Sequence, residues 1–141
     1  MNSYNVPMDI PPALAEQALE KMGFRAYPAV SESGLGQIYQ AWCRSVPFDN
    51  IRKRIQVSQG IQGALPGFTP EDFFSHWLRF GTGGTCWASH GALYALLKAA
   101  GFSVQFGLST MRSPRPASAG SPGHGTLFVR LEETLFIVDA T

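Results

Sequence analysis

Apolar residues recur at helical spacing along the first hundred positions of the chain. This spacing predicts a helix over 13–22, which Gly23 ends, and a second helix that buries Trp42 on its apolar face. An X-Pro step within 46–51 then breaks the second helix, because the residue before a proline avoids helical backbone angles. Residues 56–67 have scattered glycines and no clear period, so we expect a loop there.

Two further helices are expected in the middle of the chain. Thr69 and Pro70 provide a cap and a first-turn proline for a helix with an aromatic face. The next helix is expected over 87–100, and Gly101 is a suitable residue after its last turn. The double glycine at 83–84 predicts a tight turn between these two helices.

The hydrophobic period changes after the fourth helix. Residues 102–108 alternate between apolar and smaller or polar side chains, as a strand does. Residues 113–123 are rich in Pro, Ser and Gly and are expected to form a loop. Two more strands, over 126–131 and 134–139, flank a pair of glutamates and most simply form a hairpin.

Helices come first and strands last, which predicts an α+β fold. We expect a helical domain over 1–101, followed by an antiparallel β segment over 102–141 that starts a β domain. The last strand stops close to Thr141, so we expect a truncated version of a larger fold. The open edge of such a sheet favours pairing with another strand, and we therefore expect self-association there.

The composition gives no support for a nucleic-acid-binding, disulfide-rich or membrane-spanning protein. The chain has 141 residues, 45% of them hydrophobic and 15% charged, which suits one compact domain with a core. A net charge of +1 without a basic stripe gives no support for a nucleic-acid partner, and the cluster at 52–54 is expected in a solvated loop. The two cysteines form no disulfide framework, and neither a signal peptide nor a bilayer-length apolar run is present. We expect a cytoplasmic protein with no membrane partner.

Cys86 is the strongest candidate for chemistry. It follows Gly83-Gly84 at the start of a predicted helix, where the helix dipole and unpaired N–H groups favour a thiolate. A thiolate attacks carbonyl carbon. Downstream, His124 and Asp139 lie at the edges of two predicted strands. The order Cys, His, Asp suggests an acyl-transfer triad in which the His activates the thiol and the Asp orients the His.

Each of these residues also has a simpler interpretation. A lone Cys is usually a small buried hydrophobe, as we expect of Cys43, and a His or Asp near a turn is usually solvated. The order of the three residues and the glycines before Cys86 favour the triad. Cys86, His90 and His124 could in principle hold zinc, but no fourth ligand is evident, so we expect no metal.

Four parts of the chain resemble the arylamine N-acetyltransferases. They are Val46 to Ile51, similar to V-P-F-E-N-L; Gly83 to Cys86, similar to R-G-G-x-C; the segment from Leu93 to Val104; and His124 to Leu127 with Phe136 to Asp139, similar to H-x-x-L and Y-x-V-D. The likeness runs from about Leu19 to the end of the chain, and it corresponds to the N-terminal half of a family chain.

The resemblance implies a cysteine-proteinase-like fold and a ping-pong transfer of acetyl from acetyl-CoA to an arylamine, a hydrazine or a similar small amine. Cys86 would be the nucleophile, His124 its proton shuttle and Asp139 the residue that orients the ring. Phe48 would line the acceptor pocket, and Gly120 and Ser121 would lie near the path of CoA. Because half of the family chain has no counterpart, we expect this polypeptide alone to bind CoA weakly or not at all.

Three positions depart from the family pattern. Thr82 stands in place of an Arg, Ala88 in place of a Glu, and His90 in place of an Asn. Loss of both members of an ion pair is compatible with folding, but it changes the surroundings of Cys86. Two alternatives therefore stay open: a thiol hydrolase or transglutaminase-like enzyme with the same triad, and a catalytically degenerate binding module.

Overall fold

The structure, a computed structural model, describes residues 8–110 and 123–141. Within these ranges, five helices precede three strands, so the α+β prediction is confirmed. The helices are α1 (Pro12–Lys21), α2 (Glu32–Ser45), α3 (Ile51–Ser58), α4 (Pro70–Phe80) and α5 (Cys86–Ala99). The strands are β1 (Ser103–Ser109), β2 (His124–Leu131) and β3 (Thr134–Val138).

Local signals fix the start and end of α4. The Thr69 hydroxyl accepts a 3.2 Å hydrogen bond from the N–H of Asp72, as the cap prediction requires. Gly81 has a φ of 73°, a left-handed backbone angle that glycine adopts without steric cost, and it ends the helix. The double glycine then leads the chain into α5, which begins at Cys86 itself.

Helix α3 was missed by the sequence prediction. The residues at its start were assigned to a helix break, and those at its end to a loop, but 51–58 is helical. None of its residues is buried, and the helix is short, so Ile51 and Ile55 are too few apolar positions to mark a helical period. The expectation that 52–54 is a solvated loop is also wrong, since Arg52 lies 2.9 Å from Asp72 in an ion pair that ties α3 to α4.

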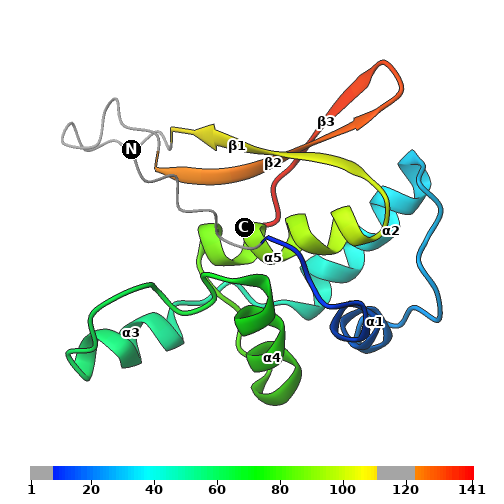
Figure 1. Ribbon diagram of the computed structural model, residues 1–141. Helices are drawn as coiled ribbons and strands as arrows, with labels where there is room; N and C mark the ends of the chain where they lie inside the picture. Colours follow the sequence, from blue (N-terminus) through cyan, green and yellow to red (C-terminus); the bar gives the residue numbers. More distant parts are fainter. Residues whose placement is uncertain (1–7, 111–122) are drawn as a thin grey trace.

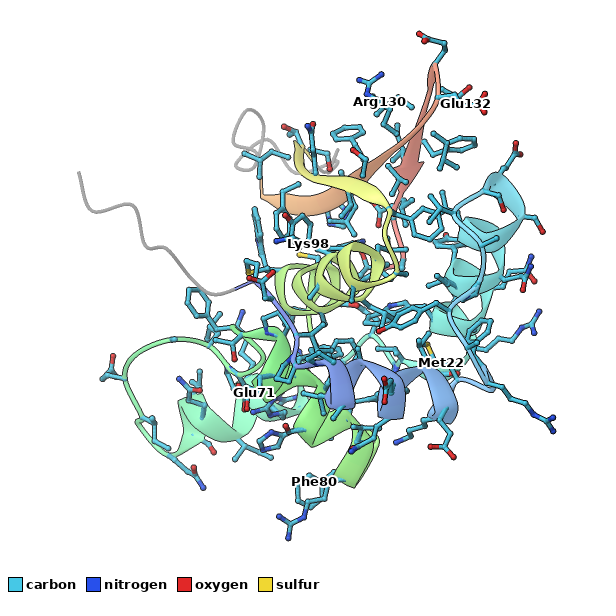
Figure 2. All side chains as sticks on the ribbon, turned by 45° about the vertical axis from the view of Figure 1, so that its right-hand side comes forward. Met22, Glu71, Phe80, Lys98, Arg130 and Glu132 are labelled. Carbon is cyan, nitrogen blue, oxygen red and sulfur yellow. The ribbon has the colours of Figure 1, made fainter. Side chains whose placement is uncertain are left out.

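The three strands form an antiparallel sheet in the order β1-β2-β3, and α5 lies against one face of it (Figure 1). Phe106 of β1 pairs with Leu127 of β2, which pairs with Val138 of β3. The predicted hairpin is confirmed, although β2 begins two residues earlier than expected, at His124. Figure 2 shows Arg130 and Glu132 at the far tip of this hairpin.

One hydrophobic core joins the helices to the sheet. Trp42 stacks on Phe73 at 5.9 Å, and both are almost fully buried, as is Val129 of β2 in the same cluster. Burying a large apolar side chain stabilises a fold by roughly 1.5–3 kcal/mol, so these aromatic rings hold the helical layer together. Cys43 is exposed, which contradicts the expectation that it packs inside. The division at residue 101 stays a prediction.

Candidate active site

The turn before Cys86 is held by the segment that contains Asp49. Phe48 and Gly84 form an isolated parallel bridge, and the N–H of Asp49 donates to the carbonyl of Gly84 at 3.1 Å. In return, the N–H of Gly83 donates to Oδ2 of Asp49 at 2.7 Å. A Cβ on Gly83 would collide with the carbonyl oxygen of Pro47. The close approach of these two backbones therefore requires glycine at position 83.

Cys86 is the first residue of α5 and is partly exposed. Its cap residue, Thr85, makes no side-chain capping bond, so the first N–H groups of the helix have no side-chain acceptor there. The positive end of the helix dipole favours an anion at this place. A thiolate on Cys86 would be stabilised by the same field.

His124 and Asp139 are joined by a 2.7 Å hydrogen bond between the ring Nε2 and the carboxylate Oδ2. His124 opens β2, and Asp139 follows the last residue of β3, so the hairpin brings them together. Burial alone would raise the pKa of the Asp139 carboxyl, but the hydrogen bond from His124 and one from Thr141 lower it below its ordinary value. The carboxylate is therefore ionised at neutral pH and orients the ring.

The other ring nitrogen of His124, Nδ1, is not used by Asp139. Cys86 and His124 lie at the same corner of the molecule, because His90 contacts both. His90 Nδ1 is 2.9 Å from the Cys86 carbonyl oxygen, and the rings of His90 and His124 meet edge to face at 5.8 Å. Within residues 8–110 and 123–141, the hydrogen bonds include none between the Cys86 sulfur and the His124 ring.

Two side chains outside the predicted triad also reach the segment that carries Asp139. The Tyr39 hydroxyl donates to the Asp139 carbonyl oxygen at 2.8 Å, and the N–H of Ala140 donates to Nε2 of His90 at 3.0 Å. In the sequence, Tyr39 lies in the predicted second helix, close to Trp42, and carries no functional signal. His90 was considered as a possible zinc ligand and as the residue that stands where the resemblance has an Asn.

The other predicted positions have different outcomes. Phe48 is 60% exposed beside the turn that leads to Cys86. Gly120 and Ser121 lie outside the described residues. Ala88 is buried against Gly84, and the buried Thr82 hydroxyl has no hydrogen-bond partner among the described residues. Neither side chain is charged, so the ion pair of the family pattern is lost as a whole.

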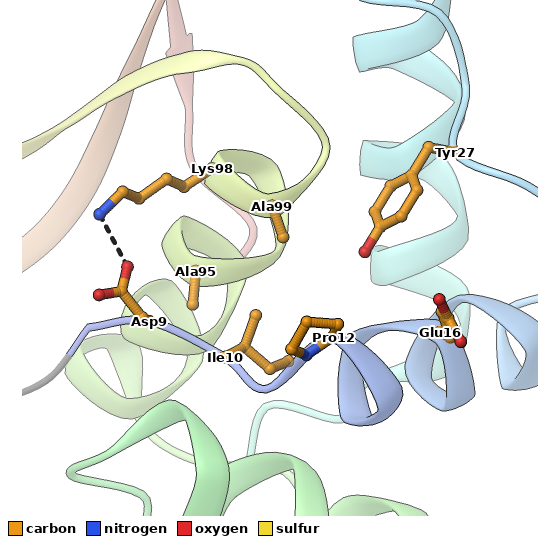
Figure 3. A pocket seen from close by; sticks show the side chains of 8 residues that line it. All are labelled: Asp9, Ile10, Pro12, Glu16, Tyr27, Ala95, Lys98 and Ala99. Atoms are coloured by element: carbon orange, nitrogen blue, oxygen red, sulfur yellow. Dashed lines mark hydrogen bonds and ion pairs between the residues drawn. The ribbon is translucent and has the colours of Figure 1, made fainter.

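Two surface pockets lie away from this corner. One, of about 420 Å³, lies at the opposite end of α5 from Cys86, where Lys98 pairs with Asp9 at 2.8 Å (Figure 3). The other, of about 440 Å³, lies between α3 and α4. In the described part of the chain, no group of three or more His, Cys, Asp or Glu residues is arranged to hold a metal ion. None of the helices described is long and apolar enough to cross a membrane.

Comparison with known proteins gives both a sequence match and a fold. The sequence model of the N-acetyltransferase family matches residues 33–141. The arylamine N-acetyltransferase of M. smegmatis has 26% identity and a TM-score of 0.70 over 88% of this chain and 44% of its own. That of Bacillus cereus, described as having a Cys-His-Glu catalytic triad, has 20% identity and a TM-score of 0.71 over 90% of this chain and 48% of its own.

The arylamine N-acetyltransferase of M. tuberculosis gives a similar result, with 17% identity and a TM-score of 0.71 over 88% of this chain and 45% of its own. The chain thus spans about half the length of the solved structures that it matches. Comparison with curated proteins gave no match.

Proposed function

The chain belongs to the N-acetyltransferase family, and we propose that it moves an acetyl group from acetyl-CoA to an arylamine, a hydrazine or a similar small amine. Cys86 is the nucleophile in this proposal, His124 the proton shuttle and Asp139 the residue that orients the ring. The observation that carries it is the 2.7 Å bond between His124 and Asp139 at the corner where α5 presents Cys86.

The reaction has two halves. In the first, His124 takes the proton of Cys86, and the sulfur attacks the carbonyl carbon of acetyl-CoA. A bond forms between the Cys86 sulfur and the acetyl carbon, the bond to the CoA sulfur breaks, and CoA leaves with the proton from His124. In the second, the amine nitrogen attacks the thioester, its proton passes through His124 to the sulfur, and Cys86 is restored.

The geometry supports this division of roles. Asp139 occupies Nε2 of His124, which leaves Nδ1 as the nitrogen for the Cys86 proton. The start of α5 stabilises the thiolate while the proton resides on the ring. The triad needs no metal ligand, and none is part of the proposal.

Phe48 is the proposed wall of the acceptor site. It is exposed, yet its backbone is tied to the turn before Cys86, so an aromatic amine stacked on its ring would lie near the sulfur. The role of Gly120 and Ser121 beside CoA is a prediction from the resemblance alone.

The test separates acyl transfer from its alternatives. The chain is mixed first with acetyl-CoA and, in parallel, with p-nitrophenyl acetate, which does not depend on CoA binding, and mass spectrometry locates any acetyl group. We expect acetyl on Cys86 that an added arylamine removes as the N-acetyl product, and no transfer by Cys86→Ala. If the ester is hydrolysed and added amine gives no N-acetyl product, the chain is a thiol hydrolase. No acetyl on Cys86 from either donor would reject the proposal and leave a binding module.

A further inference from the structure

The peptide group that follows Asp139 is held from both sides by side chains. Its carbonyl oxygen, on Asp139, accepts a 2.8 Å hydrogen bond from the hydroxyl of Tyr39 in α2. Its N–H, on Ala140, donates a 3.0 Å bond to Nε2 of His90 in α5. Since β3 ends at Val138, this peptide lies beyond the strand, and two helices supply its partners.

The contacts of His90 define its protonation state. A carbonyl oxygen only accepts, so the 2.9 Å contact with Cys86 places the proton of His90 on Nδ1. Nε2 then has no proton and accepts from Ala140. The ring is 1% exposed, and this burial lowers the pKa of His90, while the nearby Asp139 charge opposes the effect. His90 is therefore a neutral residue that acts as donor at one nitrogen and acceptor at the other.

The orientation of the Asp139 carboxylate depends on this peptide. The carboxylate is 35% exposed, and apart from His124 its hydrogen bonds among the described residues go to the neighbouring Thr141. Its Oδ1 also lies 3.5 Å from Nε2 of His90, so His90 faces the carboxylate as well as the peptide. Because β3 ends at Val138, a shift of the 139–140 peptide would move the Cα of Asp139, which carries the carboxylate, relative to the His124 ring. The hydrogen bonds that hold this peptide therefore also help to hold the Asp139 carboxylate against His124.

We propose that Tyr39 and His90 are positioning residues, which fix the peptide after Asp139 and so hold its carboxylate on His124. The inference rests on the proposed function, in which Asp139 orients the ring that activates Cys86. It also gives a physical role to His90, which stands where the family pattern has an Asn. A histidine spans from the Cys86 carbonyl to the Ala140 amide, and an asparagine is too short to reach both.

The variants separate the two nitrogens of His90. The amide of Asn takes the place of Nδ1 and that of Gln takes the place of Nε2, so His90→Gln can still accept from Ala140 whereas His90→Asn cannot. Tyr39→Phe removes only the hydroxyl. Tyr27→Phe and His76→Gln are matched controls, because Tyr27 and His76 lie outside this corner. All are made with Cys43→Ala, so that Cys86 is the one thiol that reacts and no new hydroxyl lies beside Tyr39.

Three measurements are made on each variant of the 141-residue chain: the iodoacetamide alkylation rate of Cys86 from pH 6 to 8, the amide exchange of Ala140, and the melting temperature. Loss of one hydrogen bond corresponds to about a fivefold effect. We expect His90→Asn and Tyr39→Phe each to slow alkylation about fivefold and to change its pH dependence. His90→Asn should also speed exchange at Ala140. His90→Gln and both controls should stay within about twofold of the parent.

The inference is overturned if Tyr39→Phe and His90→Asn lower the melting temperature but leave the rate and its pH dependence unchanged, because that pattern marks a purely structural role. If His90→Asn does not fold, Tyr39→Phe decides alone. A parent protein whose Cys86 reacts no faster than glutathione at pH 6 would reject the proposed function itself, and the positioning role with it. The two failures are therefore distinguishable.

Discussion

The carboxylate of Asp49 accepts the backbone N–H of Gly83 at 2.7 Å, across 34 positions of sequence. Its other oxygen accepts the N–H of Ile51 at 3.0 Å, at the start of α3. One side chain therefore satisfies two backbone donors and fixes the turn that leads into α5. The position of Cys86 depends on this contact as much as on the helix that follows.

Asp49→Asn should destabilise the turn, because an amide offers one acceptor oxygen in place of two. One of the two backbone donors then loses its partner, and since Gly83 is buried we expect a cost of about 1–3 kcal/mol. Urea unfolding measures this cost. Asp49→Ala should cost at least as much, and an unfolding free energy equal to that of the parent in both variants would show that the turn is held by other contacts.

Gly83→Ala should displace the same turn, since the added methyl group meets the carbonyl oxygen of Pro47. Backbone displacement of this kind costs about 1–3 kcal/mol, and Cys86 should lose its reactivity toward iodoacetamide. The matched control is Gly36→Ala in α2, where a methyl group meets nothing within 4 Å. That variant should be as stable as the parent or more stable by up to about 1 kcal/mol. Equal effects of the two substitutions would contradict this account.

Acid should destabilise the fold through His90. The pKa of this ring is lowered from 6.5 by burial, so below pH 6.5 the unfolded chain binds a proton that the native state excludes. The unfolding free energy should therefore fall as the pH drops below 6.5. His90→Gln should flatten this slope, whereas His76→Gln should leave it in place. Urea titrations at several pH values measure it, and identical slopes for His90→Gln and the parent would refute the assignment.

Asp72 should add a second stage of acid sensitivity. Burial raises the pKa of its carboxyl, but the N–H of Gly67 and the guanidinium of Arg52 more than offset this, and the net pKa lies below 3.8. The stability that the ionised carboxylate provides is present above pH 3.8 and is lost as the pH falls through the lower, native value. Asp72→Asn should remove this stage and weaken the link between α3 and α4, which circular dichroism during an acid titration would detect.

The parts of the fold that were predicted correctly carry local signals. Thr69 and Pro70 mark the start of α4, and two strand-like runs on either side of a pair of glutamates predict the hairpin of β2 and β3. Helix α3 was missed because Ile51 and Ile55 are exposed and its other residues also remain at the surface. A short surface helix has too few apolar residues at helical spacing for the sequence to predict it.

The site was predictable in part for the same reason. The sequence proposed Cys86 from the glycines beside it, and His124 and Asp139 from their order along the chain, and the structure pairs His124 with Asp139. The contacts of Asp139 with Tyr39 and His90 were not predictable, because Tyr39 is 100 positions from Asp139 and His90 is 50 positions from Ala140. Side-chain to backbone bonds over such separations depend on the finished fold.

The most direct test of the central claim is the relative alkylation rate of the two cysteines at pH 6, measured by peptide mass spectrometry on the intact protein. Cys43 is exposed and Cys86 is only partly exposed, so accessibility alone favours Cys43. If the start of α5 and the His124–Asp139 pair activate the thiol, Cys86 should react at least about tenfold faster, and His124→Gln should remove the difference. A Cys86 that reacts at the rate of Cys43 or more slowly would contradict the account.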